Sequence, residues 1–287
     1  MIRFLTVLAA LAVSTLAVTG FAAHAQTAQP RIASHCIALA ESVPGLTYLH
    51  HASETDNFRA PLPEFDVRIH YLSHASFLIQ SPGGASAVTD YTGYIGNVDF
   101  LPDVVTMNHA HDTHWTAFPD PAIPHVLKGW GESFGAGIDH NLMVKDMKVR
   151  NVSTDIRSHS GVEPEGNSIF VFEAAGLCIG HLGHLHHEPD AAQYAALGRM
   201  DVVMAPVDGG MTLDLDTMTK VLKRLQASVV IPMHWFGRYT LDRFLADMSD
   251  QFAIERTGKH SLQLSLRDLP KTPTVVVLEP RHIEEYE

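Results

Sequence analysis

The strongest chemical signal in the sequence is a set of three histidines within six residues. His109, His111 and His114 follow the apolar run 103–107, whose pattern is typical of a buried strand. Residues i and i+2 of extended backbone point to the same side, so His109 and His111 can offer two imidazoles to one ion, and a turn can return His114 to the same cavity. The spacing predicts a metal site at a strand end, and the alternative is three solvated loop histidines.

Further histidines lie where other apolar runs end or turn. His74 lies between two expected strands, and His234 directly follows the apolar run 229–233. Because strand-end loops meet along one rim of an α/β sheet, we expect these histidines to share a site. The other candidates are His159 in the loop 157–160 and His181, His184, His186 and His187 in the run 177–187. The residues expected to be structural or at the surface are His74, His125, His140, His260 and His282, of which His74 is the first exception, as a residue that hydrogen-bonds to a ligand.

Composition narrows the possible partners. Acidic residues outnumber Lys and Arg by 32 to 20, a formal net charge of −12, which disfavours nucleic acid or an anionic membrane as a partner and leaves a small-molecule substrate. The oligomeric state cannot be predicted. The 2 cysteines cannot form a cysteine-based zinc site, so any metal must be held by histidine and carboxylate. A domain of this length does not need a disulfide, which favours unpaired thiols at Cys36 and Cys178, although an oxidising compartment permits a bridge.

The N-terminal residues have the pattern of a secretory signal peptide. Arg3 precedes the nearly uncharged run 4–22, and Ala23-His24-Ala25 matches a cleavage site. We expect a signal peptide over 1–25, an N-terminal extension over 26–66 and a hydrolase domain over 67–287. The mature protein is then periplasmic or secreted, with no membrane attachment after cleavage. The alternative is that the apolar run serves as a membrane anchor.

The remaining pattern predicts the elements that position the histidines. Short β-rich runs come first and strand–helix alternation follows, which is typical of a layered α/β domain with packed sheets and outer helices. Turn signals lie at 81–84 and 163–166. Asp190, Asp214 or Asp216, and Thr240 can cap helices. The expected strands are 67–72, 76–79, 87–89, 103–107, 148–152, 168–172, 177–179, 201–205, 229–233 and 274–278, and the expected helices are 190–197, 218–225 and 241–248.

These ordered motifs resemble the metallo-β-lactamase-fold hydrolases, in particular their lactonase-like and phosphodiesterase-like branch. The resemblance runs from Val67 to His234. It implies an α/β fold of the four-layer αββα sandwich type in a single domain. It also implies a first metal site at His109, His111 and His159, with His114 and His234 in a second.

Two departures from the family pattern affect the expected metal content. Thr113 occupies the position of the motif aspartate, with Asp112 one residue early, and His184 occupies that of the bridging aspartate. Two dications close together repel unless anionic ligands offset the charge. We therefore expect one tightly bound Zn²⁺ and a second ion held weakly or not at all, near His114, His184 and His234.

The expected activity is attack by a metal-bound hydroxide on an ester, lactone or phosphoester in an exported zinc hydrolase. Asp112 and His184 are the candidate catalytic groups besides the metal ligands. Asp90, Asp208 and His74 are expected to orient ligands from behind, as metal-bound imidazoles usually require. Two alternatives remain: a metal-binding protein that has lost catalysis, and a redox metalloprotein holding iron or copper.

Overall fold

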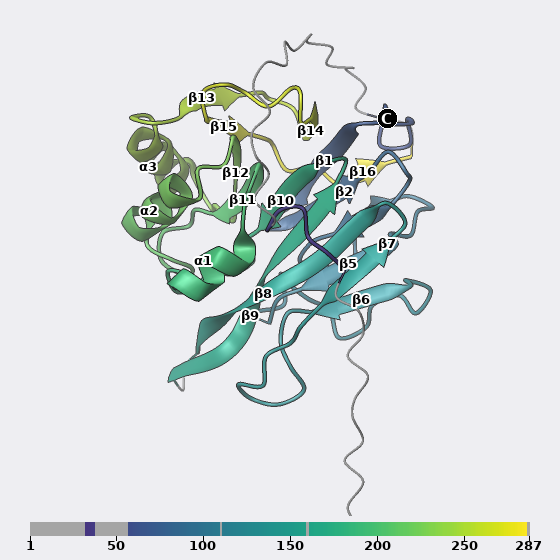
Figure 1. The fold of residues 1–287 in the computed structure, drawn as a ribbon, viewed down its shortest axis with the longest axis horizontal. Coiled ribbons are helices and arrows are strands. Elements are labelled where there is room, and N and C mark those ends of the chain that lie inside the picture. The colour runs from purple at the N-terminus through teal and green to yellow at the C-terminus, as the bar shows by residue number, and fades with distance from the viewer. Residues whose placement is uncertain (1–31, 38–56, 110, 159–160, 286–287) are drawn as a thin grey trace, which may run out of the picture. The chain divides into compact units, whose positions relative to one another are not determined.

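The computed structural model describes residues 32–37, 57–109, 111–158 and 161–285. The expected signal peptide, most of the expected extension and His159 lie outside these residues. The description concerns the compact unit from Ile32 to Glu287. Its fold class is the predicted one, an α/β sandwich in which two sheets pack face to face (Figure 1).

The first sheet has six described strands in the order β14-β1-β2-β3-β5-β6. The hairpin strands β1, β2 and β3 pair antiparallel, whereas β3, β5 and β6 run parallel. Both faces of this sheet are covered, which explains why β1 and β5 are almost continuously buried. The bounds are β1 Asp66–Ser73, β2 Ser76–Gln80, β3 Ser86–Val88, β5 Val104–Met107, β6 His125–Lys128 and β14 Ser261–Ser265.

The second sheet has eight described strands in the order β13-β15-β12-β11-β10-β9-β8-β7. Its half from β10 to β13 is parallel and its half from β7 to β10 is antiparallel. A separate pair joins β4 (Gly96–Asn97) to β16 (Ile283–Glu284). The bounds are β7 Asn141–Val144, β8 Met147–Ser158, β9 Gly161–Ala174, β10 Leu177–His181, β11 Val202–Pro206, β12 Val229–Met233, β13 Ala253–Arg256 and β15 Thr274–Val277.

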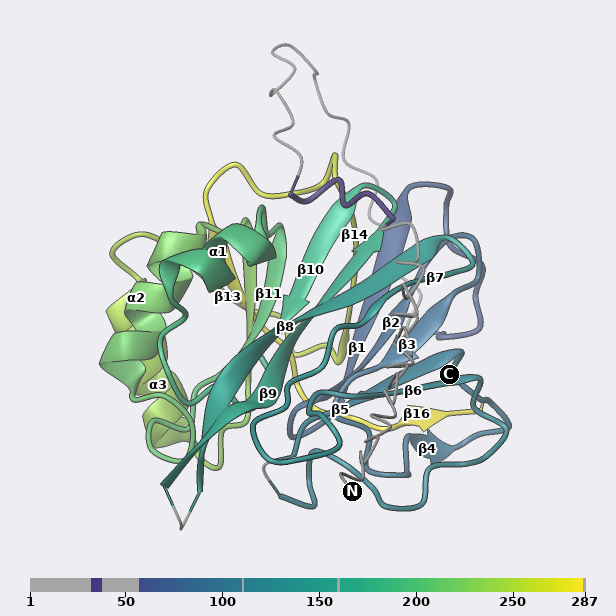
Figure 2. The same ribbon diagram turned by 60° about the horizontal axis from the view of Figure 1, so that its bottom comes forward.

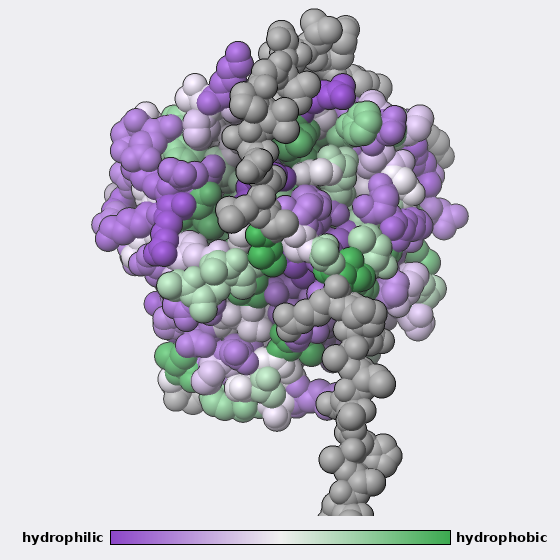
Figure 3. Space-filling view, viewed as in Figure 1, coloured by the Kyte–Doolittle hydropathy of each residue, from purple (hydrophilic) through white to green (hydrophobic). Residues whose placement is uncertain are grey.

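Three described helices cover the outer face of the second sheet (Figures 1 and 2). The helices α1 (Ala191–Leu197) and α2 (Leu215–Leu225) begin after the predicted caps Asp190 and Asp214, whose carboxylates accept backbone N–H bonds. The helix α3 (Arg238–Met248) starts three residues before the predicted 241, after Gly237. Hydrophilic residues lie over α2 and α3 in Figure 3, as amphipathic helices require. No described helix has the length and apolar content needed to cross a membrane.

The two sheets are held together by apolar side chains from their facing sides. Ile69 and Phe77 of the first sheet meet Phe170 and Ile179 of the second in one buried cluster. A second cluster lies between the eight-stranded sheet and the helices. Loops supply much of the layer over the outer face of the six-stranded sheet, where Phe58 and Tyr91 are buried. The sandwich therefore fixes the strand ends that carry the histidines.

The hairpin of β8 and β9 corrects one sequence prediction. The expected turn at 163–166 is wrong, because these residues continue β9 and Glu163 lies opposite Ile156. The register shifts between Thr154 and Ile156. The end of the hairpin is largely exposed, so it lacks the apolar alternation from which a strand is predicted. Figure 2 shows this long hairpin extending past the neighbouring strands.

A disulfide joins Cys36 to Cys178 of β10, so the prediction of two unpaired thiols is wrong. The segment 32–37 lies against this sheet, since Arg199 N–H donates to the Cys36 carbonyl at 2.8 Å. The Ser34 hydroxyl also donates to Glu173 at 2.6 Å. Contacts across 142 residues of sequence place the two thiols together, and sequence spacing does not reveal them.

We predict that the double change Cys36→Ser with Cys178→Ser lowers the free energy of unfolding by about 2–5 kcal/mol, because the bridge closes a long loop and restricts the unfolded chain. Urea unfolding under non-reducing conditions measures this. Ser34→Ala, which removes one hydrogen bond of the same segment, serves as the control and should cost about 1 kcal/mol. Equal stability of the double variant and the unmodified protein would contradict the prediction.

Candidate metal centre

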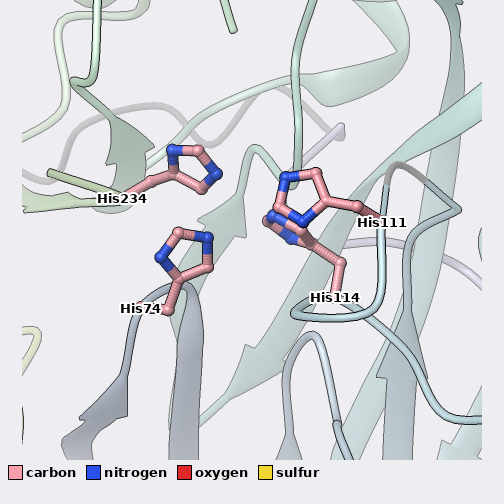
Figure 4. Close-up of side chains that lie close together, drawn as sticks. All are labelled: His74, His111, His114 and His234. Carbon is pink, nitrogen blue, oxygen red and sulfur yellow. The ribbon is translucent and has the colours of Figure 1, made fainter. Parts of the chain in front are cut away.

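Four imidazoles converge at the ends of strands from both sheets. His74 lies in the turn between β1 and β2, His111 and His114 in the loop after β5, and His234 directly after β12. Each offers one ring nitrogen, and these atoms all lie within 4.8 Å of one another. Figure 4 shows the four rings facing a common space, with His74 and His234 opposite His111 and His114. We call this set the histidine cluster.

The backbone around the histidine cluster is strained. His74, Asp90 and His234 have φ values of 43°, 40° and 55°, a region that residues other than glycine seldom occupy. Such strain gathers at functional sites, where the surrounding structure holds it. The His234 N–H donates to the His74 carbonyl at 2.9 Å, and His181 Nε2 donates to the Ala75 carbonyl at 2.7 Å. These bonds join the two sheets at the site.

Two buried carboxylates lie beside two of the clustered rings. His114 Nδ1 donates to Asp90 Oδ2 at 2.5 Å, while Asp90 Oδ1 accepts from Asn108 Nδ2 at 3.0 Å. His234 Nδ1 lies 3.1 Å from Asp208 Oδ1, and Asp208 also accepts a backbone bond from Gly210 at 2.9 Å. A proton held on Nδ1 leaves the lone pair of Nε2 available. This arrangement is the one that metal-binding histidines usually have.

The cluster contains ring nitrogens that need a partner. The Nε2 atoms of His74, His114 and His234 are buried and have no hydrogen-bond partner among the described residues. Burying polar atoms without partners is costly. A cation that accepts nitrogen lone pairs satisfies all of them, so the residues present fit a metal ion with a preference for imidazole.

Burial keeps these imidazoles neutral, which is the form that binds metal. It lowers the pKa of His74 to about 3, with the neighbouring imidazoles adding to the shift, and that of His114 well below its usual range. Burial raises the pKa of Asp90 to about 6. Burial also acts to raise the pKa of Asp208, but hydrogen bonds from His234, Thr212 and the Gly210 backbone hold it well below its ordinary value.

A chain of hydrogen bonds runs from the β8–β9 hairpin into the cluster. The Arg157 N–H donates to His186 Nδ1 at 2.6 Å, so neutral His186 carries its proton on Nε2 and donates to His184 Nδ1 at 2.5 Å. His184 must then donate from Nε2 to His111 Nε2 at 3.2 Å. His111 in turn donates from Nδ1 to the Thr113 hydroxyl at 2.8 Å. One backbone amide therefore sets the tautomers of three neutral imidazoles.

The structure separates some residues that the sequence analysis grouped. The His109 ring stacks on Trp130 with centroids 4.8 Å apart, and its Nδ1 lies 3.8 Å from Glu163 Oε2. It is not part of the histidine cluster. Asp112 is exposed. His159, the third residue of the expected first metal site, lies outside the described residues, so a site of His109, His111 and His159 stays a prediction.

The structure also brings a residue into the cluster that the sequence analysis had placed outside the set of ligands. His74, expected behind the ligands, lies within the cluster. The signal that could have revealed this is a histidine in a tight turn between two buried strands. Asp90 and Asp208 contact the rings of His114 and His234, and His184 contacts His111 rather than joining the group of four. The link through His186 was not predicted.

Known proteins resemble this chain in sequence. Residues 68–234 match the family model described as the β-lactamase superfamily domain. A metal-dependent hydrolase of Methanospirillum hungatei is 28% identical over 202 residues, covering 64% of this chain and 88% of the relative. One from Nanoarchaeum equitans is 25% identical over 186 residues, covering 59% and 84%.

Solved structures show the same fold. A candidate Zn-dependent hydrolase of the metallo-β-lactamase superfamily from Thermotoga maritima has a TM-score of 0.54 and 28% identity, covering 74% of this chain and 99% of its own. The chain belongs to the metallo-β-lactamase superfamily. It is a metal-dependent hydrolase of that superfamily, the class in which these relatives are named.

We predict that His114→Ala abolishes tight metal binding, because the ring supplies a buried Nε2 to the cluster. Asp90→Asn should weaken metal binding by about 10- to 100-fold, since the carboxylate no longer holds the His114 tautomer. His282→Ala is the control, as that ring lies beside Tyr94 rather than in the cluster. Metal content after desalting, and competition with a chelator, measure both effects. Full metal content in His114→Ala would place the site elsewhere.

We also predict that the metal-free protein loses stability as the pH falls below about 6.5. The unfolded state then takes up protons on histidines whose folded pKa is lowered, to about 3 for His74 and about 4 for His186. Asp90 opposes this, because its raised folded pKa adds stability as the pH falls from about 6 towards its ordinary value of 3.8. The loss of stability from several histidines is expected to exceed the gain from the single carboxyl group of Asp90.

Urea unfolding between pH 7.5 and pH 4 tests this pH dependence. His186→Gln removes one of the lowered histidines, so its stability should fall less steeply below pH 6.5. A pH-independent free energy of unfolding over this range would contradict the assignment of neutral buried imidazoles.

Proposed function

We propose that this protein is an exported zinc-dependent hydrolase of small esters, lactones or phosphoesters. The observation that supports this best is the set of buried Nε2 atoms on His74, His114 and His234, which lie close together and have no hydrogen-bond partner in the described part of the chain. Asp90 and Asp208 stand behind two of these rings. This is the donor set of a metal centre built from neutral imidazole.

Zinc suits this donor set because it accepts three or four imidazole nitrogens. When bound at the histidine cluster, zinc would lower the pKa of a coordinated water to about 7 and polarise the scissile oxygen of the substrate. We expect one tightly bound ion per chain. The bridging aspartate of the family pattern is replaced by His184, whose N–H faces His111, and a neutral ring cannot offset the charge of a second dication.

Two residues near the cluster are candidates to assist the reaction, one as a hydrogen-bond donor and the other as a general base. His184 points an N–H towards His111 at the edge of the cluster, so the neutral ring can offer a hydrogen bond to a substrate oxygen while keeping its proton. Its Nδ1 is held by His186 at 2.5 Å, which fixes the orientation of the ring. Asp112 remains the candidate general base, because its exposed carboxylate lies in the same loop as His111 and His114.

Hydrolysis of p-nitrophenyl esters, lactones and bis(p-nitrophenyl) phosphate by zinc-loaded protein tests the proposal. We expect turnover of at least one class, loss of 100-fold or more in His114→Ala, and no change in His282→Ala. Elemental analysis should give one zinc per chain. Bound zinc without turnover would favour a metal-binding protein that has lost catalysis. Colour and an electron paramagnetic resonance signal from iron or copper would favour a redox protein.

The proposed export is supported by two features. The sequence begins with the signal-peptide pattern over residues 1–25. The disulfide between Cys36 and Cys178 is of a kind that persists in oxidising compartments such as the periplasm or the exterior.

N-terminal sequencing of protein from the extracytoplasmic fraction should find a chain that starts at or near Gln26. The expected result follows from cleavage after Ala25. Ala25→Leu should block cleavage, whereas Ala9→Leu within the apolar run should not. Intact Met1 on protein recovered from the cytoplasm would overturn the proposal of export.

A further inference from the structure

We propose that Phe236, together with Met211 and Tyr239, forms an apolar subsite beside the histidine cluster. This subsite selects neutral esters or lactones that carry a hydrophobic group next to the scissile bond. The inference rests on the proposed function and narrows its substrate class.

Phe236 is in direct contact with the histidine cluster. Its ring centroid lies 5.4 Å from that of His74 and 5.3 Å from that of His234. Nevertheless 66% of the residue remains exposed. The phenyl ring therefore packs on two of the clustered imidazoles and leaves most of its surface open to solvent. The exposed surface of this ring is available to contact a substrate group beside the cluster.

Met211 extends the apolar surface on a neighbouring loop. Its N–H donates to Asp208 Oδ2 at 2.5 Å, and Asp208 Oδ1 lies 3.1 Å from His234 Nδ1. Arg157 Nη2 donates to the carbonyl of Met211 at 3.3 Å. Both the N–H and the carbonyl of Met211 are therefore held by hydrogen bonds close to the cluster. Half of the residue is nevertheless exposed.

Tyr239 lies in the first turn of α3, three residues after Phe236, and is 80% exposed. Phe236 lies in the connection between β12 and α3, which His234 begins, and Tyr239 lies in the helix that follows it. Single exposed apolar residues are common on protein surfaces. Here Phe236 and Met211 lie on the two loops that carry and support His234, with Tyr239 in the helix that follows, and exposed apolar patches can mark ligand-binding surfaces.

The charges around the cluster favour a neutral substrate over a phosphodiester. Asp90 and Asp208 contact rings of the cluster, and Asp112 is exposed in the loop that carries His111. The guanidinium of Arg157 already donates to the carbonyls of Met211 and Thr212. Arg238 is exposed between Phe236 and Tyr239 and could bind an anionic substrate group. The experiment must therefore distinguish a neutral substrate from an anionic one.

The first test compares p-nitrophenyl acetate, butyrate, hexanoate and octanoate with the zinc-loaded protein. We expect kcat/KM to rise by about twofold per added methylene, as for half-burial of each group. Phe236→Ala should flatten this rise and Phe236→Leu should restore part of it. Phe65→Ala is the matched control, because Phe65 is also a partly exposed phenylalanine, 48% exposed and in contact with Arg267. Phe65 precedes the start of β1, whereas His74 follows the opposite end of that strand.

The second test needs no turnover. Isothermal titration of the metal-free protein with butanol and octanol should show tighter binding of octanol, and Phe236→Ala should remove the difference while Phe65→Ala retains it. Equal binding of both alcohols would overturn the inference.

The outcomes separate the two proposals. Absence of turnover on every ester, lactone and phosphoester contradicts the proposed hydrolase function, and the titration still decides whether the apolar subsite exists. Turnover with a flat chain-length series overturns the subsite alone. Preference for bis(p-nitrophenyl) phosphate, lost in Arg238→Ala, overturns the assignment of a neutral substrate.

Discussion

The site depends on keeping several imidazoles uncharged where strands of two sheets meet. Burial disfavours the charged form of each ring, and each ring that could become charged would repel the next. This is why the pKa of His74 falls to about 3 and that of His114 falls well below its usual value. The same desolvation raises the pKa of Asp90. Burying the ring nitrogens of His74, His114 and His234 without hydrogen-bond partners among the described residues costs free energy, and a bound cation would offset this cost.

The sandwich supplies the rigidity that this arrangement needs. The histidine cluster draws on the β1–β2 turn of one sheet and the end of β12 in the other, and a backbone bond from His234 to His74 joins them. The apolar layer between the sheets fixes their separation. The positive φ values at His74, Asp90 and His234 are held by this packing rather than by local preference.

His184 gives this chain a feature that differs from the family pattern. An aspartate there would offer a negative charge to two ions, whereas His184 donates an N–H to His111. Its tautomer is set from the Arg157 backbone through His186. The hairpin that carries Arg157 also holds the Met211 loop. The β8–β9 hairpin thus supports both the polar side of the site and its apolar rim.

The sequence alone determined the fold class and the region of the site. Histidines at the ends of apolar runs, and strands followed by strand–helix alternation, follow from local periodicity, which depends on near neighbours in the chain. The caps at Asp190 and Asp214 were predictable for the same reason. Asp90 and Asp208 contact His114 and His234, and the role predicted for them in orienting metal ligands stays a prediction.

Only the tertiary structure decided which imidazoles meet. His74 enters the cluster and His109 turns to Trp130 because side-chain direction depends on the turn conformation and on packing partners far away in sequence. The Cys36–Cys178 bridge spans 142 residues. The series of hydrogen bonds from Arg157 to His111 joins three segments that are separate in sequence. Such contacts form when the sheets pack together, so local sequence patterns do not predict them.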